Sequence, residues 1–85
     1  MSRVSIEGSK AIDGKSVTPN DTEDLSAVTN GIYLGAKGDL QVTLEHMGDG
    51  ESITFVGLPA GTIHPLRVKR VWATNTTATD IIAVY

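Results

Sequence analysis

Apolar residues along this chain alternate with polar ones or cluster in short runs, and no window has the spacing of an amphipathic helix. Glycine or proline interrupts most longer segments. This pattern predicts an all-β protein, a small antiparallel β-sandwich or β-barrel (jelly-roll-like) of about seven short strands. Because apolar and polar positions alternate, each predicted sheet has one buried face and one exposed face.

Two hairpins are the clearest predicted elements. The first joins a strand over residues 31–36 to a strand over 40–45 through a tight turn at Lys37 to Asp39. The second joins residues 64–73 to residues 79–85. In both, every second residue is expected to point into the core.

Further short strands are predicted outside the hairpins. Residues 15–18 form one, and residues 53–58 form another that Pro59 ends, because proline cannot donate to a ladder. Within the latter strand, Ile53 and Phe55 are expected to line the inner face.

The N-terminal residues 1–14 are predicted to be an arm or a short edge strand, separate from the β-sandwich domain of residues 15–85. Arg3 to Glu7 alternates, with Val4 and Ile6 on one side. Such a segment is able to add a strand to another protein or to a neighbouring copy.

The small size of the chain predicts assembly. A domain of 85 residues has a thin core, and without cysteine it has no disulfide to reinforce that core. Its last predicted strand reaches Tyr85, and a strand must pair both of its edges. We therefore expect another copy of the chain to pair with the leftover edge.

The charge balance and hydropathy exclude several partners. The formal net charge is −3, which argues against a general affinity for nucleic acid or for an anionic membrane surface. No stretch approaches the roughly 20 apolar residues of a membrane helix, and the N-terminus lacks the apolar core of a secretory signal. We expect the chain to be made in the cytoplasm.

One basic stripe, formed by Arg67, Lys69 and Arg70, is the best candidate for contact with nucleic acid. No set of stacking aromatic residues is interleaved with it, as single-strand binders require. We expect these cations to pair instead with acids such as Glu45, Glu51 or Asp80.

Catalytic and metal-binding patterns are weak. The carboxylates between Asp21 and Asp24 lack the ligand spacing of an EF-hand and are expected to form a solvated turn. His46 and His64 have no second ligand nearby in sequence, and no Gly-x-Ser-x-Gly elbow occurs. We expect no enzymatic activity, no metal and no cofactor.

Several apolar or aromatic positions are hard to fit into so thin a core and are candidates for an interface. The alternative for Trp72 is that it plugs one end of the sandwich. The predicted interface positions are Val4, Ile6, Tyr33, Val56, Leu58, Pro59, Arg67, Trp72 and Tyr85.

Five sequence blocks carry a resemblance to a known family: VTPNDTEDL (17–25), GIYLGAKGDL (31–40), ITFVGLPAG (53–61), PLRVKRV (65–71) and ATNTTATDIIAVY (73–85). In their order and spacing they resemble the spike base protein of tailed bacteriophages and gene transfer agents. The resemblance covers roughly residues 15–85, and residues 1–14 depart from the family pattern.

The resemblance implies a structural virion protein on the capsid exterior. Such a protein assembles as a homo-oligomer, a trimer or a pentamer, binds the major capsid protein and supports a spike or fibre protein. Members of such phage modules also serve as capsid decoration or cement proteins, and the divergent N-terminal segment leaves both roles open.

Other functions remain alternatives. A carbohydrate-binding or other small β binding module has the same fold class, but it needs a platform of exposed aromatic residues, and this chain has one Trp and two Tyr. A toxin inhibitor or a small regulatory binder is a further alternative. An enzyme has the least support from the sequence.

Overall fold

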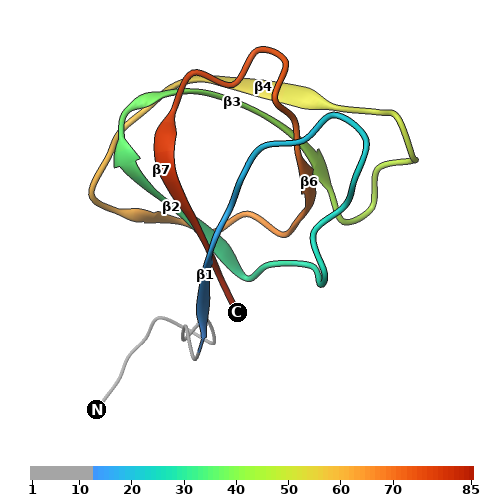
Figure 1. Ribbon diagram of the computed structural model, residues 1–85, viewed down its shortest axis with the longest axis horizontal. Coiled ribbons are helices and arrows are strands. Elements are labelled where there is room, and N and C mark those ends of the chain that lie inside the picture. Colours follow the sequence, from blue (N-terminus) through green and yellow to red (C-terminus); the bar gives the residue numbers. More distant parts are fainter. Residues whose placement is uncertain (1–12) are drawn as a thin grey trace.

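Seven β-strands form the part of the chain that the computed structural model describes, residues 13–85, and this part contains no helix (Figure 1). The all-β class and the number of strands agree with the sequence-based prediction. Val4 and Ile6 lie outside the described residues. The strands are β1 (Gly14–Ser16), β2 (Gly31–Ala36), β3 (Gly38–Leu44), β4 (Ile53–Leu58), β5 (Ile63–His64), β6 (Val68–Val71) and β7 (Thr79–Val84).

The strands make two antiparallel sheets. Sheet A has the order β1-β7-β2-β5, and sheet B has the order β4-β3-β6. Apolar side chains from both sheets form a single buried cluster between them. Its members are Ile32, Leu34, Leu40, Val42, Val68, Val71, Ala78, Ile81 and Ala83.

The first predicted hairpin is wrong in its pairing, although both of its strands exist. Only Lys37 separates β2 from β3, yet β2 pairs with β5 and β7 whereas β3 pairs with β4 and β6. The two strands are therefore nearly continuous and bend from sheet A into sheet B. A bulge beside the bend, between Gly38 and Leu40, is the kind of irregularity by which strands turn such corners.

The second predicted hairpin is also wrong. Its first arm is split into β5 and β6, and β6 pairs with β3, whereas β7 pairs with β1 and β2. Both edges of β7 are thus paired within the chain. The expectation that this last strand needs another copy to complete it is therefore incorrect.

Two of the places where the chain changes sheets, between β2 and β3 and between β6 and β7, are bonded to each other. The Asp39 carbonyl accepts the backbone N–H groups of Thr77 (2.9 Å) and Ala78 (3.2 Å), and the Asp39 N–H donates to the Thr77 hydroxyl (2.8 Å). The main chains pass so closely that a β-carbon on Gly38 would lie 2.6 Å from the Ala78 nitrogen. Only glycine allows this approach.

Residues 17–29, which we call the strap, close the opposite side of the sandwich. The strap leaves the edge of β7 and follows the free edge of β6. It supplies the backbone hydrogen bonds that this edge would otherwise lack. The N–H groups of Asn20, Leu25 and Thr29 donate to the carbonyls of Val71, Lys69 and Val68.

Two side chains fix the strap. The Thr29 hydroxyl, fully buried, donates to the Leu66 carbonyl (2.7 Å) and accepts from the Val68 N–H (3.0 Å). The Asp21 carboxylate accepts the Ala73 N–H (2.8 Å), the Thr74 N–H (2.9 Å) and the Thr74 hydroxyl (2.7 Å). These bonds to Thr74, with the bond from the Thr74 hydroxyl the largest cause, lower the pKa of Asp21.

We predict that Gly38→Ala destabilises the protein by about 2 kcal/mol or more, because the new methyl group collides with backbone atoms that cannot rotate away. Urea unfolding followed by circular dichroism measures the change. Gly48→Ala is the matched control, since its β-carbon would meet nothing closer than 3.5 Å. Equal stability of the two variants would contradict the argument.

We predict that Asp21 contributes to the pH dependence of stability. Because its pKa is lower in the folded protein, its contribution is present above the unfolded pKa of about 3.9 and is lost as the pH falls through the folded value. The difference in Tm between the native chain and Asp21→Asn should therefore be largest at neutral pH and shrink on acidification. Melting curves from pH 7 to pH 3 measure it, with the 94% exposed Asp49 changed to Asn as control. A difference that does not vary with pH would refute this role.

Candidate assembly surfaces

A transverse row of four side chains crosses the outer face of sheet A. The strand register pairs Ser16 with Ile82, Ile82 with Tyr33, and Tyr33 with Ile63. Paired residues of antiparallel strands project from the same face, and the chain neighbours of this row on β2 and β7 are buried. We call these four residues the outer row. Ile63 is 50% exposed, and Tyr33 and Ile82 are half-buried.

A glycine beside the outer row leaves room for neighbouring apolar side chains. A β-carbon on Gly31 would lie 2.7 Å from the Cγ2 atom of Ile63 and 3.1 Å from the Cγ2 atom of Val84. The missing side chain lets both apolar residues lie against the sheet. The outer face of sheet A is therefore apolar over several strands, which is unusual for a surface that meets only water.

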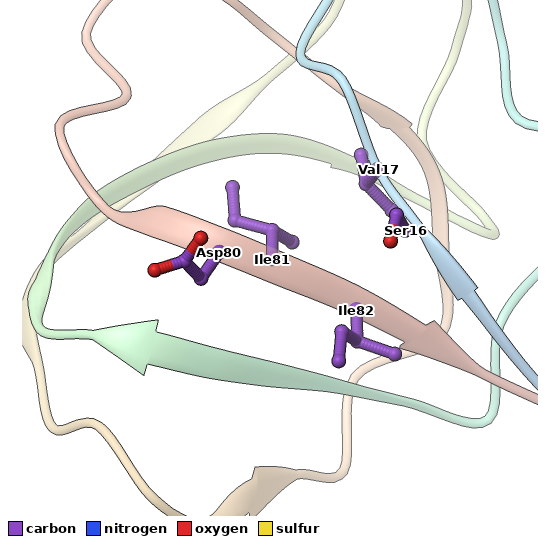
Figure 2. A pocket seen from close by; sticks show the side chains of 5 residues that line it. All are labelled: Ser16, Val17, Asp80, Ile81 and Ile82. Atoms are coloured by element: carbon purple, nitrogen blue, oxygen red, sulfur yellow. The ribbon is translucent and has the colours of Figure 1, made fainter.

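A depression of about 290 Å³ lies beside the outer row, where β1 ends against β7 (Figure 2). Asp80 supplies its only ionisable side chain and has a positive φ of 54°. This backbone conformation fits opposite Gly35, whose β-carbon would lie 2.5 Å from that of Asp80. The lining residues are Ser16, Val17, Asp80, Ile81 and Ile82.

The outer face of sheet B is polar and is covered by its own side chains. The Trp72 indole N–H donates to the buried Thr43 hydroxyl (2.9 Å), and the Arg70 guanidinium lies 5.2 Å from the Trp72 ring centroid. The Asn75 amide donates to the side chain of Gln41 (2.8 Å). Trp72 is thus half-buried on the outer face and does not belong to the core cluster.

A bulge in β6 changes which of its side chains face the core. Val42 pairs with Val71 and Leu44 pairs with Val68. Lys69 is therefore the extra residue of the bulge and has no partner residue on β3. In regular alternation two valines three positions apart would face opposite sides, whereas here both are buried.

The basic stripe is paired within the chain. Arg67 contacts Glu45 at 2.6 Å and donates to the Asn30 side chain at 2.8 Å. This pairing lowers the pKa of Glu45 and raises the pKa of Arg67, with the side-chain hydrogen bond as the largest cause. Lys69 donates to a backbone carbonyl and Arg70 contacts a carboxylate of the strap. The expectation that these cations pair with acids of the chain is therefore correct. Of the acids named as examples, Glu45 is a partner, whereas Lys69 and Arg70 contact Asp49 and Asp24.

A second, open depression of about 350 Å³ lies beside the Arg67 and Glu45 pair. Leucine and proline side chains give it an apolar lining next to that charged pair. The lining residues are Leu44, Glu45, His46, Pro65, Leu66 and Arg67.

The β4 edge carries the most exposed large hydrophobic side chain among the described residues. Val56 is 77% exposed and Pro59 is exposed, whereas Leu58 packs against the core. Ile53 was expected inside. Its register with Val42 keeps it on the inner side, but the strand is an edge strand and leaves it 44% exposed.

The predicted interface positions do not converge on one patch. Tyr33 belongs to the outer row, Val56 to the β4 edge and Trp72 to sheet B, while Tyr85 packs against the core at the end of β7. The sequence indicated Ile63 only as part of the turn region 58–65, a predicted binding region, and it missed Ile82, which lies on the other side of Tyr33 in the outer row. The run Ile81-Ile82-Ala83-Val84 contains no polar residue to mark the outward positions, so alternation gave no signal there.

The remaining features concern metal binding, His64 and membrane-spanning helices. Within residues 13–85 no group of three or more His, Cys, Asp or Glu side chains is arranged to hold a metal ion. The His64 ring nitrogen lies 2.9 Å from the Pro59 carbonyl oxygen. The described segment also has no helix with the length and apolar character needed to cross a membrane.

A sugar-binding platform has little support. The four aromatic residues of the chain are all half-buried, whereas such a platform needs exposed aromatic residues. These residues are Tyr33, Phe55, Trp72 and Tyr85.

Comparison with known proteins gives an informative match to a solved structure. No protein-family model matches the chain, and no curated protein does. A chain in a structure of the capsid of a native gene transfer agent particle, computed with C5 symmetry, is 32% identical to it. The match covers 98% of this chain and 92% of that chain, with a TM-score of 0.77. The chain therefore belongs to the same family as this gene transfer agent capsid chain, a family of phage-like capsid-associated proteins.

Proposed function

We propose that this chain is a structural protein on the exterior of a phage-like capsid, acting as a head spike base, decoration or cement protein. One observation carries the proposal: the near full-length match, at 32% identity, to a chain of a gene transfer agent capsid. The surface chemistry agrees with it, since the described residues offer exposed apolar side chains for contact, among them Val56 and Ile63.

The proposed mechanism is mechanical. Copies join as a closed homo-oligomer, a trimer or a pentamer, and the oligomer binds the major capsid protein and supports a spike or fibre protein. Each contact is modest, but symmetry repeats it, so the assembly is held far more tightly than one copy alone.

The outer row is the proposed contact with the capsid protein. It crosses all four strands of sheet A, with a serine on β1 and the apolar or aromatic residues Ile82, Tyr33 and Ile63 on the other three, and it lies beside Gly31, which leaves room for Ile63. The outer face of sheet B is the weaker candidate, because Trp72 and Arg70 already pair with neighbours in the chain. Burial of an apolar row by a capsid subunit provides the driving force.

Particle membership is the direct test of the proposal. We predict that quantitative mass spectrometry of density-purified particles, from the strain that encodes the chain, finds it at a fixed ratio to the major capsid protein. The ratio should survive a high-salt wash, because the proposed contact is mainly apolar. Absence of the chain from washed particles would end the proposal.

We predict that Ile63→Glu weakens binding to particles at least tenfold, equivalent to about 1.4 kcal/mol, because it puts a charge into the outer row. Its melting temperature should stay within a few degrees of native, since the side chain is half exposed. Pelleting of purified protein with particles that lack the chain measures the binding. Ser26→Glu adds the same charge at an exposed position outside sheet A and should bind normally. Normal binding by Ile63→Glu would refute the contact.

A further inference from the structure

We propose that the free edge of β4 accepts residues Arg3–Glu7 of a neighbouring copy as an added β-strand, so that the copies join head to tail. This inference deepens the proposed function by naming the contact between copies. It concerns the isolated protein, so it can fail while particle membership holds, and the reverse is also possible.

The first observation is that the regular part of β4, residues 53–55, has an unprotected edge, since the bulge lies beyond Phe55. It pairs only with β3, and within residues 13–85 no strand pairs with its other edge. The sequence ITFVGL has no charged residue and no proline, which are the usual devices that keep an edge from pairing. Val56 is 77% exposed and Ile53 is 44% exposed along this edge.

The second observation fixes the direction of the backbone groups at Thr54. Thr54 lies opposite Gln41, whose carbonyl accepts the Trp72 N–H (2.9 Å) and whose N–H donates to the Thr76 hydroxyl (3.0 Å). Both groups of Gln41 therefore point away from β4. In an antiparallel ladder, when one residue of a directly opposed pair points its N–H and C=O away from the partner strand, the other residue does the same. The N–H and C=O of Thr54 thus face the free edge.

The third observation is the match of pattern. In Arg3-Val4-Ser5-Ile6-Glu7 the apolar residues alternate with polar ones. A strand of this pattern added beside β4 sets Val4 and Ile6 next to Ile53 and Phe55 on the inner side, and Ser5 next to Thr54 on the outer side. The partly exposed rim of the core is thereby covered.

The fourth observation favours a neighbouring copy over the chain itself. β1, which the segment precedes, lies on the opposite side of the molecule from β4 (Figure 1). The seven residues from Glu7 to Gly14 span at most about 25 Å when fully extended. Because β1 and β4 lie on opposite sides, the arm of one copy and the β4 edge of the next would form a contact between two different surfaces, and a contact of this kind closes into a ring when the rotation between copies allows it.

The test is a mixing experiment on the full-length chain, followed by light scattering after size exclusion. The native chain should form a closed oligomer larger than a dimer. Ile6→Asp, which damages the arm, and Thr54→Pro, which removes a donor only from the free edge, should each be monomeric. Thr54→Val keeps that donor and should assemble normally. Circular dichroism checks that each variant is folded.

Mixing the two defective variants distinguishes head-to-tail pairing from a symmetric contact between identical surfaces. The Ile6→Asp copy keeps a sound β4 edge and the Thr54→Pro copy keeps a sound arm, so an equimolar mixture should give a one-to-one dimer and nothing larger. A monomeric native chain, a variant that keeps the native oligomer, or a mixture that gives anything except the dimer would overturn the inference.

Disulfide trapping keeps the inference testable if Thr54→Pro unfolds. The chain has no cysteine, so the double variant Ser5→Cys with Thr54→Cys contains the only two thiols. Oxidation with copper phenanthroline should give a ladder of covalently linked copies on a non-reducing gel. A disulfide within one copy, or none, would refute pairing between copies.

Discussion

The fold depends on the contact between two of its corners, β2–β3 and β6–β7, where the Asp39 carbonyl accepts hydrogen bonds from the backbone N–H groups of Thr77 and Ala78. Each corner carries the chain from one sheet to the other, and neither is held by a local hairpin ladder. Because Gly38 has no side chain, the corners can approach until their main chains are bonded directly. The stacking of the two sheets, and hence the shared core, follows from this close approach.

The sequence predicted the strands better than it predicted their partners. Ile32 and Leu34 on β2, and Leu40 and Val42 on β3, were all expected to point inward, and all four are fully buried. Their alternation is a local signal. Pairing is not local, because a short polar turn such as Lys37 to Asp39 is compatible both with a hairpin and with a bend between sheets. Only the distant partner at Thr77 distinguishes them.

The candidate surfaces could be predicted only in part, again because a local pattern does not show how the strands are arranged in the sheets. Tyr33 was recognised because it is an aromatic residue between two buried neighbours, and Val56 because it is hard to place inside so thin a core. Ile82 could not be recognised, since every residue around it is apolar. Ile53 was assigned to the correct side of its strand, but its exposure depends on β4 being at the edge of sheet B, which is a property of the whole topology.

The position of β7 between β1 and β2 also determines how the domain bears a load. Hydrogen bonds in antiparallel ladders run perpendicular to the strands. A pull along β7 from its end at Tyr85 therefore strains the bonds of both ladders together, in shear, and they cannot be opened one after another as in unzipping. An anchoring module attached through this strand would resist detachment until many bonds failed at once.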